Sequence, residues 1–170
     1  LLNLMQKYTK GRDLTRPAVT RFVTQYSTLK SVLEQRVGLR IFFTSNEWED
    51  SQFSRKIEGK EVQDIILTKK DFWDGIKYCL KSTIPLVKVL RLVDGDAKPA
   101  MGYIYEAMDQ AKEKIASNFQ NVESRYEDVW EIIDKRWNAQ LYRPLHAAGM
   151  FLNPKYRYDD KFKIDLEVKK

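Results

Sequence analysis

Apolar residues recur at every third or fourth position through much of the chain, the spacing that gathers them on one face of an α-helix. Thr15 suits the position that caps a helix, and Pro17 suits a first turn, where a backbone N–H would lack a partner in any case. The pattern therefore predicts a helix from about residue 15 to about residue 37. Its apolar stripe consists of Val19, Phe22, Val23, Tyr26, Leu29, Leu33 and Val37.

Two further stripes predict helices in the second half of the chain. One helix is expected over residues 99–119 and another over residues 124–141, and a short helix is expected to begin at Pro144 and to end before Asn153. The apolar positions are Met101, Ile104, Tyr105, Met108, Ala111, Ile115 and Phe119 in the first, and Tyr126, Val129, Trp130, Ile133 and Trp137 in the second.

The segment after residue 38 is less regular. Residues 39–43, with the sequence LRIFF, could form a strand or continue the preceding helix. Ser45 is followed by acidic residues, and this order predicts the start of a helix because acids stabilise a helix N-terminus. Gly59 predicts a turn, and residues 60–67 predict a short helix after it.

The next predicted helix begins near residue 70 and contains a proline. Thr68 and Asp71 have the spacing of a capping box at a helix start. Pro85 predicts a kink or a break, because the residue before a proline avoids the helical region. Gly95 predicts the end of the segment that follows. The residues expected to face inward are Phe72, Trp73, Ile76, Leu80 and either Tyr78 or Cys79.

Strand signals are few along the chain. Strict alternation of polar and apolar residues occurs only near the end, over residues 161–168, and no two-residue hairpin turn is present. The sequence therefore predicts an all-α fold, an irregular helical bundle in a single domain over residues 1–170. Residues 1–14 and 159–170 are expected to be flexible ends. Because the chain does not begin with Met, we expect it to be part of a longer protein.

The net charge of +6 is concentrated in residues 7–40. This segment holds two acids, Asp13 and Glu34, against eight cations, so it carries the whole excess and the rest of the chain sums to zero. Concentrated positive charge favours an anionic partner such as nucleic acid, and a solvated basic surface without a partner is the alternative. The cations are Lys7, Lys10, Arg12, Arg16, Arg21, Lys30, Arg36 and Arg40.

No catalytic site or cofactor site is expected in this chain. A single cysteine, Cys79, and a single histidine, His146, exclude disulfides within the chain and the usual Cys/His zinc sites. Cys79 is expected to be a buried thiol and His146 a structural residue. Asp94 and Asp96 flank Gly95, which is ordinary turn chemistry rather than a metal site. No glycine-rich phosphate loop is present, and no apolar run approaches the ~20 residues that span a bilayer.

The tryptophans have two interpretations. Aromatic rings among cations can stack on single-stranded nucleic acid, but Trp73, Trp130 and Trp137 lie on apolar helix faces, and we expect them in the core. Trp48 lies between two glutamates, and its burial is less clear from the sequence.

Several long segments together resemble one protein family. They are similar to the central region of hAT-superfamily DNA transposases, and most closely to transposon-derived plant proteins that carry BED zinc fingers. The resemblance extends from about Leu14 to Tyr158. It rests on RPAVTRFVTQYSTLKSVLEQR, on FWDGIKYCLKSTIPLVKVLRLVDGDAKPAMGYIYEAMDQAKEKI, and on IIDKRWNAQLYRPLHAAGMFLNPKYRY.

The resemblance implies a non-catalytic role in a nuclear protein. In that family an RNase H-like core supplies three acidic metal ligands, and a helical domain is inserted between the second and third acids. This chain would be the insertion, supporting DNA binding and assembly of the parent. Active members share a Thr-Arg-Trp tripeptide whose ring is associated with a flipped base. The match here is Thr20, Arg21 and Phe22, in which Phe keeps a π face but loses the indole N–H.

Two functions therefore stay open. If the chain contacts DNA, the residues expected to do so are Arg16, Arg21, Phe22, Lys30 and Arg36, with core packing as the alternative role of Phe22. The other possibility is a domesticated module that binds another protein, or a second copy of itself, without contacting DNA.

Overall fold

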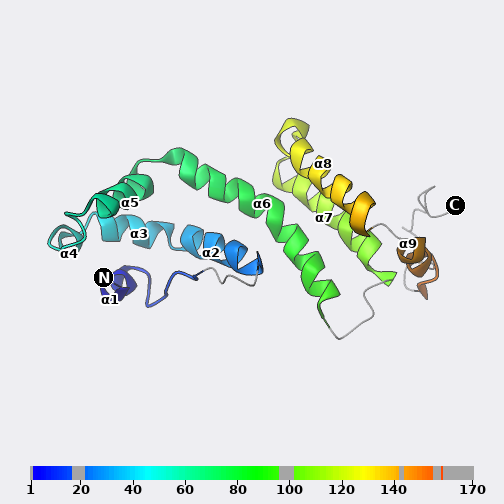
Figure 1. The fold of residues 1–170 in the computed structure, drawn as a ribbon, viewed down its shortest axis with the longest axis horizontal. Helices are drawn as coiled ribbons and strands as arrows, with labels where there is room; N and C mark the ends of the chain where they lie inside the picture. The colour runs from blue at the N-terminus through cyan, green and yellow to red at the C-terminus, as the bar shows by residue number, and fades with distance from the viewer. Residues whose placement is uncertain (1, 17–21, 96–101, 142–143, 155–157, 159–170) are drawn as a thin grey trace. The chain divides into compact units, whose positions relative to one another are not determined.

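The computed structural model describes residues 2–16, 22–95, 102–141, 144–154 and 158. Every regular element in these ranges is a helix, and no strand occurs in them, so the predicted all-α fold is confirmed (Figure 1). The chain divides into two compact units, Leu1–Leu80 and Lys81–Lys170. The single domain and the flexible ends stay predictions, and residues 159–170 lie outside the described ranges.

The first unit contains five helices and the start of a sixth among its described residues. Helix α3 packs against α1, α4 and α5, and its residues Leu39, Phe42 and Phe43 are buried. The helices are α1 (Leu2–Tyr8), α2 (Phe22–Glu34), α3 (Arg36–Phe43), α4 (Asn46–Glu49), α5 (Ile57–Leu67) and α6 (Lys70–Val93), of which α6 continues into the second unit.

An aromatic cluster fixes α4 on α3. The ring of Trp48 lies 4.6 Å from that of Phe43 and 5.5 Å from that of Phe42, both edge to face. Ser45 caps α4, because the backbone N–H of Trp48 donates to its hydroxyl oxygen over 3.3 Å. The predicted helix start at Ser45 is therefore confirmed, and residues 39–43 continue as helix rather than strand.

Helix α1 crosses α3 at a glycine. A Cβ on Gly38 would collide with the carbonyl oxygen of Tyr8, so the absence of a side chain lets the end of α1 approach α3 directly. Tyr8 also reaches α4, where its hydroxyl donates to Glu47 over 2.7 Å. The side chain of Thr9, just beyond α1, is completely buried and donates to the carbonyl of Arg12.

The second unit is built on α7 (Ile104–Asn118), whose predicted stripe is buried at Ile104, Tyr105, Ala111, Ile115 and Phe119 and half-buried at Met108, whereas Met101 lies outside the described residues. Figure 1 shows α7 and α8 (Glu127–Arg136) side by side. Ile115 and Phe119 form a cluster with Tyr126 and Ile133, against which Leu86 of α6 packs. The other elements are the 3-10 turn η2 (Glu123–Arg125), the π-helical turn η3 (Trp137–Leu141) and α9 (Pro144–Phe151).

Pro85 does not break α6, so of the two alternatives that the sequence left open, a kink or a break, the break does not occur. The helix continues from Lys70 to Val93 with Pro85 buried inside it. A proline cannot donate to the carbonyl four residues earlier, which here belongs to Lys81. The side-chain amide of Asn118 on α7 donates to this carbonyl over 2.9 Å. A neighbouring helix thus provides the hydrogen bond that the proline cannot.

Three local predictions were wrong. Gly59 lies inside α5 rather than in a turn, and a Cβ there would collide with the carbonyl oxygen of Phe53. Thr68 is the C-cap of α5 rather than the cap of α6, which begins two residues later at Lys70, and the Thr68 hydroxyl bonds back to Asp64. The helix expected over residues 15–37 includes Arg16, which is not helical, and Gln35 separates α2 from α3.

Candidate functional site

The residues predicted to contact DNA fall in different surroundings. Arg16 is exposed on the segment that follows α1. Lys30 is exposed on α2 and lies 3.7 Å from Glu34, one turn further along the helix. Arg36 is half-buried at the start of α3, and its guanidinium carbon lies 4.9 Å from the ring centre of Trp73. Arg21 and the side chain of Phe22 lie outside the described residues.

Part of the positive charge of residues 7–40 is therefore engaged within the fold. Lys7 forms an ion pair of 3.2 Å with Glu47. The hydrogen bond from Tyr8, together with those from the Glu47 backbone and Lys7, lowers the pKa of the Glu47 carboxyl below its ordinary value. Within the described part of the chain, four cations of the segment are exposed and have no ion pair: Lys10, Arg12, Arg16 and Arg40.

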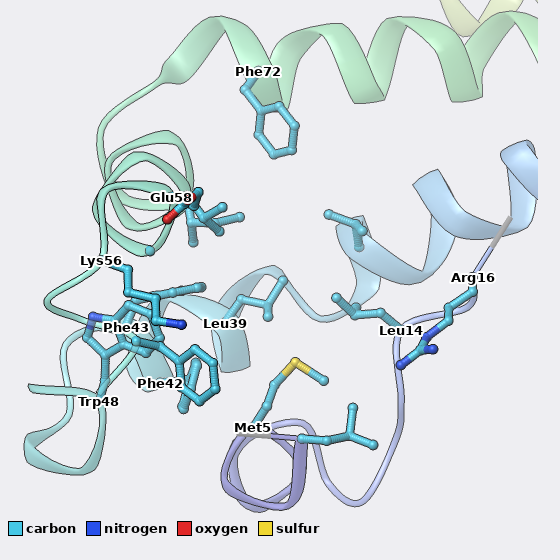
Figure 2. A pocket seen from close by; sticks show the side chains of 16 residues that line it. Met5, Leu14, Arg16, Leu39, Phe42, Phe43, Trp48, Lys56, Glu58 and Phe72 are labelled. Carbon is cyan, nitrogen blue, oxygen red and sulfur yellow. The ribbon is translucent and has the colours of Figure 1, made fainter. Parts of the chain in front are cut away.

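The first unit also contains an apolar cavity of about 610 Å³ that is partly open to solvent (Figure 2). Its walls come from α1 to α5, from the segments that follow α1 and α4, and from the start of α6. The lining is almost entirely apolar and rich in aromatic rings, including Phe42, Phe43, Trp48, Phe53 and Phe72. Sequence reasoning missed this cavity, because its walls come from segments that are separated along the chain and none of them signals a hollow by itself.

Three charged residues line the cavity, and all three are exposed: Arg16, Lys56 and Glu58. Figure 2 shows Arg16 on one side of the cavity and Lys56 with Glu58 on the opposite side. The ammonium of Lys56 lies 5.4 Å from the ring centre of Phe53. The polar atoms thus lie at the edges, while the interior presents only apolar surface.

No metal-binding group of three or more His, Cys, Asp or Glu side chains occurs among the described residues. The Cys79 thiol is exposed, which corrects the expectation that it is buried. Helix α6 buries Trp73, Ile76 and Leu80, and Cys79 lies off this face. Asp94 lies just beyond the end of α6, whereas Asp96 and the side chain of His146 lie outside the described part of the chain.

The tryptophans divide differently from the sequence prediction. Trp48 and Trp73 are both buried, with 2% of their surface exposed, and the indole N–H of Trp73 donates to the carbonyl of Ile66 over 3.0 Å. Trp130 and Trp137 are only half-buried at the margin of the second unit's core. The indole N–H of Trp130 donates to the Lys112 carbonyl over 3.3 Å, so this ring has a structural partner.

None of the described helices is both long and apolar enough to cross a membrane. Comparison of the chain with protein-family models, curated proteins and solved structures finds no match. The resemblance to hAT transposases therefore stays a prediction from the sequence. The function has to be inferred from the exposed cations and the surfaces of the two units.

Proposed function

We propose that the chain is a non-catalytic helical domain of an hAT transposase-like nuclear protein, and that its first unit contacts the phosphate backbone of DNA. The observation that carries this proposal is the group of exposed cations without an ion pair in the described part of residues 7–40. Three of them, Lys10, Arg12 and Arg16, lie after α1 within residues 10–16, a segment whose only acid is Asp13.

The geometry changes the order of the predicted DNA contacts. Arg36 is held over the ring of Trp73, so it is the weakest candidate, and its guanidinium is expected to stabilise the fold. Lys30 stays a candidate, because an exposed ion pair such as that with Glu34 contributes only about 0–1 kcal/mol and is easily exchanged for a phosphate. Arg16 stays a candidate for a phosphate contact. Lys10, Arg12 and Arg40 are additional candidates, which the list of expected DNA contacts from the sequence did not include.

The proposal is tested by fluorescence anisotropy of a labelled DNA duplex with the whole chain at several salt concentrations. The affinity falls as salt rises, and a plot of log affinity against log salt has a negative slope. Removing one cation that neutralises a phosphate should reduce the magnitude of this slope by about 1. We expect Lys10→Ala, Arg12→Ala and Arg16→Ala each to show this loss for unrelated DNA sequences, because phosphate contacts carry no sequence information.

Lys60→Ala is the matched control, since Lys60 is an exposed cation on α5 outside residues 7–40. Its substitution is expected to leave the affinity and the slope unchanged. If Lys60→Ala loses as much affinity and slope as the three candidate variants, DNA binding depends only on the net charge of the chain and not on these positions. If the chain binds no DNA at low salt, the proposal is wrong.

A protein-binding module is the second candidate, favoured by the outer face of α3. Val37 and Ile41 lie one turn apart on this helix and are 70% and 52% exposed. Exposed apolar side chains at this spacing form part of the kind of patch that partners cover. The double variant Val37→Ser with Ile41→Ser should abolish binding to such a partner and leave DNA binding intact. If the variant still binds the partner, or loses DNA binding instead, this function is excluded for the patch.

A further inference from the structure

The apolar cavity of the first unit has properties that select its occupant. Its lining is almost entirely apolar, so a molecule with an apolar body that covers this lining removes apolar surface from water, which is favourable. The volume of about 610 Å³ lies within the range of roughly 300–1,000 Å³ found for small-molecule sites, which also have mostly apolar linings. The interior therefore favours a ligand with an apolar body.

The charged residues at the edges add a second requirement. On one side Lys56 and Glu58 carry opposite charges, so this side has no net charge, and Lys56 lies close to the Phe53 ring. On the other side Arg16 is the only charged lining residue, and it has no ion pair within the described residues. Its exposure shows that this edge reaches solvent. A guanidinium in this position is suited to a carboxylate, which it can bind through two parallel hydrogen bonds.

We propose that this cavity binds a small amphiphile, with its aliphatic or aromatic body inside and one carboxylate against Arg16. The aromatic walls and Met5 provide the apolar contacts, and no polar group of the ligand enters the interior. The ligand proposal does not depend on the DNA proposal. The two share one residue, Arg16, and no other residue of the cavity lining is a candidate phosphate contact.

Decanoate and decan-1-ol are the probes for the head group, since they differ only at the end that Arg16 would meet. Isothermal titration of the whole chain should show saturable binding of one decanoate per chain. The variant Arg16→Gln should weaken decanoate by about three- to fivefold, a modest factor because Arg16 is exposed, and should leave decan-1-ol unchanged. Arg12→Gln, four residues earlier and not part of the lining, is the control and should alter neither ligand.

The location is tested with 11-bromoundecanoate, whose bromine quenches nearby indole rings. We expect it to quench the fluorescence of Trp48, which lines the cavity, and Trp48→Phe should remove that component. Val32→Trp with Val62→Trp places two additional rings in the lining and should weaken both decyl ligands by about tenfold or more, because overfilled cavities lose their ligand space. This double variant should keep wild-type affinity for DNA, which separates the ligand proposal from the DNA proposal.

The proposal is overturned if decanoate shows no saturable binding, or if it binds the doubly filled variant as well as the wild type. Equal losses of decanoate and decan-1-ol in Arg16→Gln would refute the assigned head group. Sedimentation of the ligand-free chain tests another occupant. A dimer that the double valine variant dissociates would identify a second copy of the chain as what fills the cavity, and would overturn the small-molecule assignment.

Discussion

Gly38→Ala tests the crossing of α1 and α3. Alanine normally stabilises a helix relative to glycine by about 1 kcal/mol. At this position the new Cβ would collide with the carbonyl oxygen of Tyr8 and lie only 3.0 Å from its carbonyl carbon. A backbone group cannot rotate away as a side chain can, so the end of α1 must move off α3. Overpacking of this kind costs about 1–3 kcal/mol, so after the gain in helix propensity of about 1 kcal/mol we expect a net loss of up to about 2 kcal/mol.

Gly75→Ala is the matched control. Gly75 lies within α6 and is exposed, and no other group lies within 4 Å of the position that an alanine Cβ would take. The same substitution should therefore stabilise the chain by about 0.5–1 kcal/mol. Circular dichroism at 222 nm during heating measures both variants. With about 2–4 °C per kcal/mol for a chain of this length, Tm should fall for Gly38→Ala and rise for Gly75→Ala.

The opposite signs make this comparison decisive, because helix propensity alone predicts an increase for both variants. If Gly38→Ala raises Tm as much as Gly75→Ala does, α1 does not pack against α3 at this glycine. That result would also remove one wall of the apolar cavity, since Leu2 and Met5 of α1 contribute to its lining.

Three further outcomes follow from the structure. Trp73→Ala should lower the free energy of unfolding by about 3–5 kcal/mol in urea denaturation, and the half-buried Trp130→Ala should cost clearly less. Asn118→Ala should cost about 0.5–1 kcal/mol, and this loss should disappear in a Pro85→Ala background, where the helix regains its own donor. The stability difference between wild type and Glu47→Gln should be largest at neutral pH, begin to shrink near the ordinary pKa of 4.5, and be lost as the pH falls through the lowered pKa of the folded state, because the interaction stabilises only while the carboxylate is ionised; a difference that persists in strong acid would contradict this.

The pattern of the sequence determined the helical class and the inner face of several helices. The stripe of α7 was predicted at each described position, because the period of a helix is local and each apolar residue needs only its neighbours three and four places away. The cap at Ser45 is equally local, because its hydroxyl accepts a hydrogen bond from the backbone N–H of Trp48, three residues further along. The clustering of charge in residues 7–40 was also visible directly.

Only the tertiary structure decided how irregular positions behave. Gly59 and Pro85 signal a turn and a break when they are considered alone. In the fold, Gly59 is helical where the backbone of Phe53 comes close, and α6 continues through Pro85 while Asn118 supplies a hydrogen bond from α7. The hydrogen bond that replaces the missing donor at Pro85 comes from α7, so no short window of sequence contains both partners.

The candidate sites show the same division. Charge is a property of the residues themselves, but whether a cation is available depends on what packs beside it. Lys7 and Arg36 were counted with the other cations, and the fold brings Glu47 to one and the ring of Trp73 to the other. The cavity exists only because several helices meet around a space that their side chains do not fill. The sequence determined which groups the protein has, and the packing of distant segments decided which of them a partner can reach.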